Sequence, residues 1–196
     1  MIDINLESFF FRRQRIARGL KKLDSEIQGL IQSKPDYSNS EIYEYIPSKY
    51  LNKAENMITP FKWLFVFEND FRDFCRDVLT RTIDLKKEDE LFEKLTISQE
   101  DTGKIKNRIK EEAKALSTSR VNSDVLDFFT LPELKNLIVN NTEIFKEDLP
   151  RGHRFIDTLI NQINRHRITV AHFFELDELD IQELENRLLR YYRTFD

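Results

Sequence analysis

Residues 60–81 read PFKWLFVFENDFRDFCRDVLTR, and apolar side chains recur through this stretch every three or four residues. That spacing places them on one face of an α-helix, so the sequence predicts a helix from near Pro60 to near Thr82. The residues expected on its apolar face are Phe61, Leu64, Phe65, Phe71, Phe74, Cys75, Val78 and Leu79. Sixteen phenylalanines against one tryptophan and two methionines indicate a core built largely of phenyl rings.

The composition of the whole chain indicates the same class of structure. Four glycines and five prolines in 196 residues are under half of the usual share of these turn-forming residues, about 12%. Few turns argue against a many-stranded sandwich, and a charged fraction of 34% suits amphipathic helices with polar outer faces. The sequence therefore predicts an all-α protein, a helical bundle with a long N-terminal helix.

Two parts are expected along the chain: an N-terminal helical extension, residues 1–50, and a helical domain, residues 51–196. The extension contains a predicted helix from about Asn5 to Gln32, which Pro35 ends. Apolar residues recur in it at alternating steps of four and three, a heptad-like stripe. These residues are Ile16, Leu20, Leu23, Ile27 and Leu30. Such a helix would act either as a clamp over the domain or as a contact between subunits.

Four more helices are predicted over about 98–116, 130–141, 153–174 and from about 180 to the end. Ser98 with Asp101, and Thr130 with Glu133, have the spacing of residues that cap helix N-termini. The segment LSTSRVNSD, residues 116–124, is expected to be a loop and the most mobile part of the chain.

Net charge and cysteine content narrow the class of protein. A net charge of −4 gives no global basic field, which neither indicates nor excludes a nucleic-acid partner. The single cysteine cannot form an internal disulfide, and no Cys/His cluster has zinc-binding spacing. No apolar run is long enough to cross a membrane, and the N-terminus does not resemble a signal peptide. We expect a cytoplasmic protein with no metal, no cofactor and no membrane association.

Two groups of residues could carry chemistry, and the first is Glu68 with Arg72. Glu68 interrupts the apolar face of the 60–81 helix, and a buried carboxylate is costly unless it is paired. Arg72, one turn later, is correctly placed to pair with it. The pair is interpretable either as an internal ion pair that fixes helix register or as a supporting acid that orients an active-site base.

The second group is the run NRHRITVAHFF, residues 164–174. At 100° per residue, Arg165 lies only about 20° from His172 around the helix, and Arg167 about 140° away. A histidine exchanges protons near neutral pH, and guanidinium groups suit a phosphate. The alternative is a helix-end histidine packed among apolar neighbours, with both arginines facing solvent.

The chain from about residue 60 to the end resembles the HEPN (higher eukaryotes and prokaryotes nucleotide-binding) family, an all-α family with many metal-independent ribonucleases. RITVAH, residues 167–172, has the Arg, the Ala and the His of the motif R-N-x-x-A-H, which that family carries in its penultimate helix. Three further stretches resemble the family's other helices: FENDFRDFCRDVL (67–79), FFTLPELKNLIVNN (128–141) and DELDIQELENRLLRYY (177–192). The chain departs from the family at Ile168, where Asn is usual, and at Phe174, where toxin members have Tyr.

The resemblance implies an endoribonuclease of toxin, stress or antiviral defence systems that leaves a 2′,3′-cyclic phosphate. His172 would be its general acid and base, Arg167 its phosphate contact and Arg165 a helper, with Glu68 and Arg72 in support. The family's arrangement further implies a homodimer in which two motif helices form one composite site, and it allows for a neutralising or effector partner protein. Ile168 leaves open a non-catalytic module for dimerisation or RNA binding.

A basic stretch, RRQRIARGLKK, occupies residues 12–22 of the predicted N-terminal helix. Its cations could extend such a site by contacting phosphates of the RNA backbone. These residues are Arg12, Arg13, Arg15, Arg18, Lys21 and Lys22. The alternative is that they form a solvated face of the helix.

Overall fold

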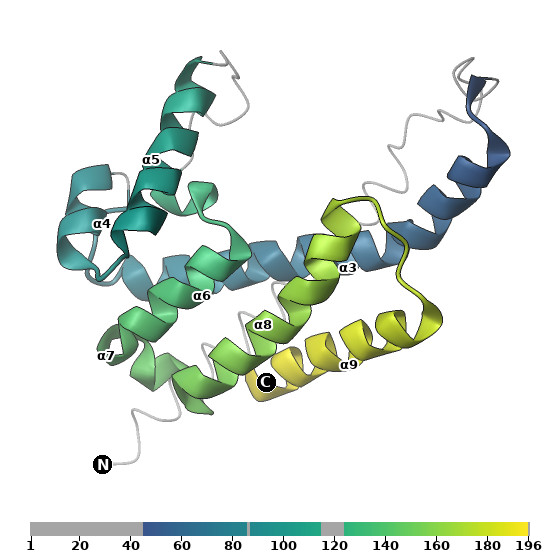
Figure 1. Cartoon of the computed structure of the whole chain (residues 1–196). Helices are drawn as coiled ribbons and strands as arrows, with labels where there is room; N and C mark the ends of the chain where they lie inside the picture. The colour runs from purple at the N-terminus through teal and green to yellow at the C-terminus, as the bar shows by residue number, and fades with distance from the viewer. Residues whose placement is uncertain (1–44, 86, 115–123, 196) are drawn as a thin grey trace, which may run out of the picture. The chain divides into compact units, whose positions relative to one another are not determined.

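The computed structural model describes residues 45–85, 87–114 and 124–195 (Figure 1). Within these ranges the regular structure is entirely helical, which confirms the all-α prediction. The elements are α3 (Ser48–Leu79), α4 (Glu88–Lys94), α5 (Gln99–Lys114), η3 (Val125–Phe128), α6 (Leu131–Asn140), α7 (Thr142–Phe145), η4 (Lys146–Asp148), α8 (Gly152–Ala171) and α9 (Glu178–Phe195). The predicted helix 5–32 with its basic stretch, and most of the predicted loop 116–124, lie outside the described residues.

The chain divides into two compact units. One comprises Met1–Asn56 with Tyr192–Asp196, and the other comprises Met57–Tyr191. The second unit holds the whole of the candidate site described below. No helix in the described part of the chain is both long and apolar enough to cross a membrane.

Helix α3 is longer than its sequence predicts. It begins at Ser48, and Pro60 is buried inside it, so the prediction of a start near Pro60 was wrong. The fixed φ of proline is compatible with a helix, but proline has no N–H to donate to the carbonyl of the residue four positions earlier. That residue is Asn56, where the first compact unit ends.

Phenylalanines along α3 form the centre of the core, as the composition indicated. Phe67, Phe71 and Phe74 follow one another along the helix with stacked rings, 5.9 and 6.3 Å between successive centroids. Tyr191 of α9 packs edge-on against Phe67, at 5.0 Å. Phe145 of α7 lies 6.2 Å from Phe74. Helices from distant parts of the sequence therefore converge on one face of α3.

The apolar face predicted for α3 is wider than the face that is buried. Phe61 and Phe65 were expected in the core but are 58% and 61% exposed, whereas Phe67, which was not assigned to that face, is fully buried. The sequence pattern merges two neighbouring stripes of the helix, and the other helices cover only one of them. The second stripe continues from Phe61 and Phe65 to Glu68 and Arg72.

Both predicted helix caps are confirmed, but the boundaries are not all as predicted. The Ser98 hydroxyl accepts a hydrogen bond from the Asp101 amide at 3.0 Å. The Glu133 carboxylate accepts one from the Thr130 amide at 2.7 Å. Helix α8 ends at Ala171, short of the predicted Phe174, because Phe173 adopts a left-handed backbone conformation. Helices α4 and α7 were not predicted, because seven and four residues are too few to show a periodic pattern.

Candidate functional site

The last turn of α8 ends in a Schellman motif that positions His172. The Phe173 amide donates to the Val170 carbonyl and the Phe174 amide to the Thr169 carbonyl, each at 3.0 Å. This pair of hydrogen bonds requires a residue in the left-handed conformation just after the C-cap, and that residue is usually glycine. Here that residue is Phe173, with φ 60°. His172 is the C-cap residue of α8, with φ −92° and ψ 11°, so the regular helix ends immediately before it.

The side chains of His172 and Arg165 both face solvent. Each residue is exposed, and among the described residues no hydrogen bond or ion pair involves either side chain. The exposure of His172 contradicts the alternative in which this histidine packs among apolar neighbours. The imidazole is accessible to a ligand in solution.

Arg167 points to a different partner, Glu68 of α3. Its Nε lies 3.4 Å from Oε2 of Glu68, while the other carboxylate oxygen of Glu68 accepts a hydrogen bond from Arg72 at 3.2 Å. The side chains of Arg72, Glu68 and Arg167 are 12%, 21% and 33% exposed, so Arg167 is the most accessible of the three. One carboxylate thus lies between two guanidinium groups, and the three side chains together carry a net positive charge.

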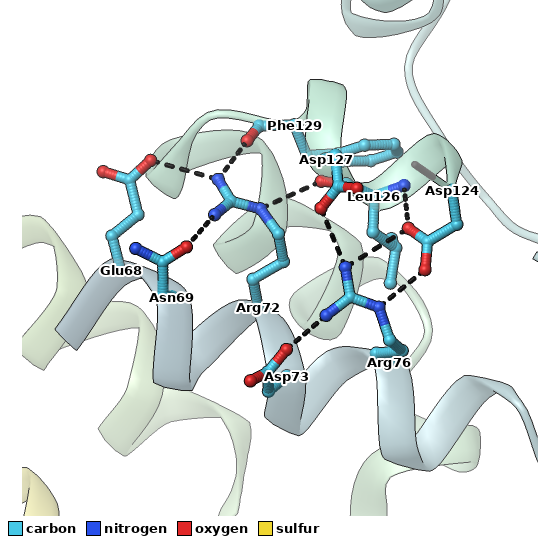
Figure 2. A network of polar contacts seen from close by, with 9 residues as sticks. All are labelled: Glu68, Asn69, Arg72, Asp73, Arg76, Asp124, Leu126, Asp127 and Phe129. Atoms are coloured by element: carbon cyan, nitrogen blue, oxygen red, sulfur yellow. Dashed lines mark hydrogen bonds and ion pairs between the residues drawn. The ribbon is translucent and has the colours of Figure 1, made fainter. Parts of the chain in front are cut away.

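Arg72 also donates hydrogen bonds to backbone carbonyls around η3, which fix its position (Figure 2). It donates from Nε to the Leu126 carbonyl at 3.1 Å and from Nη2 to the Phe129 carbonyl at 3.0 Å. The Leu126 carbonyl also accepts from the Phe129 amide at 3.1 Å, so Arg72 adds a second bond to a turn that the backbone already closes. The Glu68–Arg72 ion pair therefore has a structural role, and Glu68 also fixes the direction of Arg167.

A second arginine, Arg76, anchors the same turn one helical step further on (Figure 2). It binds Asp124 at 2.6 Å and Asp127 at 2.9 Å, and it also pairs with Asp73. Burial alone would lower the pKa of the Arg76 guanidinium, but the hydrogen bond that it donates to Asp124 and the three carboxylate charges outweigh burial and raise the pKa. The sequence did not single out this network, because its partners come from segments far apart in the chain.

The structure brings Glu68, Arg72 and Arg167 together, but it does not join them to His172 or Arg165. Arg167 turns towards α3, whereas His172 lies beyond the last turn of α8, and no described contact links the two side chains. Within one copy of the chain, the proposed acid–base group and the proposed phosphate contact are neighbours on one helix end and not a bonded pair. The basic residues 12–22 lie outside the described part.

One buried titratable group, His166, was not predicted from the sequence. Its Nε2 lies 3.2 Å from Nη1 of Arg187, and its Nδ1 lies 3.8 Å from a carboxylate oxygen of Asp180. Because a guanidinium can only donate, Nε2 must accept, so the proton of the neutral ring is on Nδ1. Burial lowers the pKa of His166, and the charge of Arg187 lowers it further. No pattern in the sequence distinguishes this histidine, because its partners lie on α9.

In the described ranges, no group of three or more His, Cys, Asp or Glu side chains is arranged to hold a metal ion. No protein-family model, no curated protein and no solved structure matches the chain. The HEPN resemblance of the 167–172 motif therefore stays a prediction.

Proposed function

We propose that the protein is a metal-independent endoribonuclease of the HEPN type, working as a homodimer. The observation that supports this most strongly is the exposed imidazole of His172 at the end of α8, one turn beyond Arg167. Each copy thus offers two kinds of group that RNA cleavage without a metal requires, a proton-transfer group and a cation for the phosphate.

The reaction would be an internal transesterification. The neutral His172 ring takes the proton of a ribose 2′-hydroxyl, whose oxygen attacks the adjacent phosphorus. The bond from phosphorus to the 5′-oxygen of the next nucleotide breaks, and that oxygen leaves with a proton from a second, protonated imidazole. The products are a 2′,3′-cyclic phosphate and a 5′-hydroxyl. During the reaction Arg167 would stabilise the negative charge that develops on the phosphate oxygens.

The need for two imidazoles is the reason to propose a dimer. One chain offers one His172 and one Arg167 that diverge from each other, and this is too sparse a site for both proton transfers. A two-fold axis beside the end of α8 would place two copies of each group around one phosphate. Arg165, exposed on the same helix, would add a second guanidinium from each copy.

The setting that the resemblance implies is also part of the proposal. The substrate would be cellular or invading RNA in the cytoplasm, cleaved as part of a toxin, stress or antiviral response. A neutralising or effector protein would then control the activity. The basic residues 12–22 would strengthen binding through backbone phosphates, with a steep dependence on salt.

The test is incubation of the purified full chain with mixed RNA in EDTA, with end-group analysis of the products. We expect cleavage to 2′,3′-cyclic phosphate ends, and His172→Ala should slow it by at least about 100-fold, the usual contribution of a general acid or base. His153→Ala is the matched control, since His153 lies on the same helix at its other end, and it should cleave like the unmodified chain. Equal cleavage by His172→Ala would defeat the proposal.

Ile168 favours a second candidate, a non-catalytic RNA-binding or dimerisation module. It is 46% exposed beside Arg167, at the position where the family's polar Asn would lie. In that case the chain binds RNA in a gel-shift assay but leaves it intact in the cleavage assay.

A further inference from the structure

Four exposed phenylalanines lie around the end of α8, and we call them the phenylalanine surface. They are Phe61 and Phe65 on α3, and Phe173 and Phe174 just after α8. The rings of Phe61 and Phe65 stack on each other with centroids 6.3 Å apart. They face solvent although both belong to a helix whose neighbouring stripe is the centre of the core.

Two contacts place the chain after Arg167 beside the stretch of α3 that carries Phe61 and Phe65. Arg167 of α8 pairs with Glu68, and the amide of Leu176, beyond the end of α8, lies 3.4 Å from the sulfur of Met57. The chain from 167 to 176 therefore runs back along α3 from residue 68 to residue 57. His172, Phe173 and Phe174 fall between these two contacts, and so do Phe61 and Phe65.

Phe173 is held in this position at a cost. It is 95% exposed and adopts φ 60°, a left-handed conformation that ordinary residues avoid. Glycine would form the same helix end without strain. Backbone strain of this kind is typical of functional sites, and burial of the ring does not compensate for it here.

The charges beside the phenylalanine surface match a polyanion. Arg165 and Arg167 lie on the α8 side, and Glu68 neutralises only part of that charge because it is shared with Arg72. Apart from Glu68, the neighbouring acidic residues are Glu175, Asp177 and Glu178, in the segment that leads into α9. A polyanion would therefore pass over α8 and the phenylalanines and avoid that segment.

We infer that the phenylalanine surface stacks unpaired bases of a single-stranded RNA whose phosphate backbone is bound by Arg167 and Arg165. This inference rests on the proposed function and adds how the substrate is held. Along α3, Phe65 and Phe61 lie about 4.5 Å and about 10.5 Å from the level of Glu68, at 1.5 Å per residue. Successive bases of one strand are about 3.4 Å apart, so these rings match bases one to three nucleotides from the phosphate at Arg167. Stacking requires bases that are not paired, which excludes a duplex.

The experiment measures binding of a 12-nucleotide single-stranded RNA, and of the same sequence as a duplex, by fluorescence anisotropy. All variants are made in the full chain carrying His172→Ala, so that cleavage does not distort the measurement. Phe61→Leu with Phe65→Leu should weaken binding of the single strand about fivefold or more, because the aromatic faces are lost while apolar bulk remains. Phe61→Tyr with Phe65→Tyr keeps the rings and should bind normally, as should Leu189→Ala, an exposed apolar residue of α9.

Further readouts separate stacking from other roles of the surface. A 2-aminopurine base in the single strand should lose fluorescence on binding the Tyr variant and lose much less on binding the Leu variant. Normal binding by the Leu variant, or equal binding of duplex and single strand, would overturn the inference. Loss of self-association by the Leu variant in light scattering would also overturn it, because the surface would then be a contact between copies.

The cleavage assay distinguishes this inference from the proposed function. If the unmodified chain cleaves RNA in EDTA and the Leu variant binds RNA normally, only base stacking is wrong. If the unmodified chain neither binds nor cleaves RNA, the proposed function fails and the inference fails with it.

Discussion

Replacing Phe173 with glycine should stabilise the protein, which is unusual for the loss of a large aromatic side chain. The left-handed conformation at φ 60° costs a non-glycine residue about 1–2 kcal/mol. Glycine removes that strain but loses about 0.5–1 kcal/mol of additional backbone entropy on folding. The ring is 95% exposed, so only about a twentieth of the usual burial energy of about 1.5–3 kcal/mol is lost.

At the midpoints of these ranges the sum predicts a gain of about 0.6 kcal/mol in the free energy of unfolding, or about 1–2.5 °C in Tm for a domain of this size. Urea titration followed by circular dichroism measures the first quantity, and differential scanning calorimetry the second. Phe174→Gly is the matched control. Phe174 is also exposed, at 67%, but its φ is not positive, so glycine there should lower stability.

The same substitution should move RNA binding in the opposite direction. If Phe173 contributes to the phenylalanine surface, Phe173→Gly gains stability and weakens binding of single-stranded RNA, a trade-off typical of functional positions. A less stable Phe173→Gly protein would refute the strain argument at this helix end. A more stable protein with unchanged RNA binding would support the strain argument and remove Phe173 from the binding surface.

Three other substitutions test separate parts of the structure. Phe71→Ala should cost about 3–5 kcal/mol, because a fully buried ring leaves a cavity in the core, and the urea midpoint will show whether it does. Thr130→Ala removes the hydroxyl that donates to Glu133 at 2.8 Å and should cost about 1 kcal/mol; a cost near zero would mean that this cap contributes little. Burial and Arg187 lower the pKa of His166 below 6.5, so the unfolded chain binds the extra proton first and stability should fall as pH drops below that value. In His166→Gln that part of the pH dependence should disappear from unfolding curves measured between pH 5 and 7.5, and an unchanged slope would contradict the assignment.

Local patterns were sufficient to predict the class of fold and much of its layout. Apolar spacing, the scarcity of glycine and proline, and the caps at Ser98 and Thr130 act within one turn of helix, where neighbours along the chain are also neighbours in space. The Glu68–Arg72 pair was predictable for the same reason. The short helices α4 and α7 were not, because they hold too few residues to show a period.

The remaining features depend on contacts between residues far apart in the chain. Periodicity shows that α3 has a broad apolar face but not which stripe other helices will cover, so Phe61 and Phe65 were expected in the core and are exposed. The pairing of Arg167 with Glu68, and of His166 with Arg187, joins different helices and follows from how those helices pack. Helix character is a local property of the backbone and its nearest side chains, whereas burial and ion pairing across helices are properties of the packed whole.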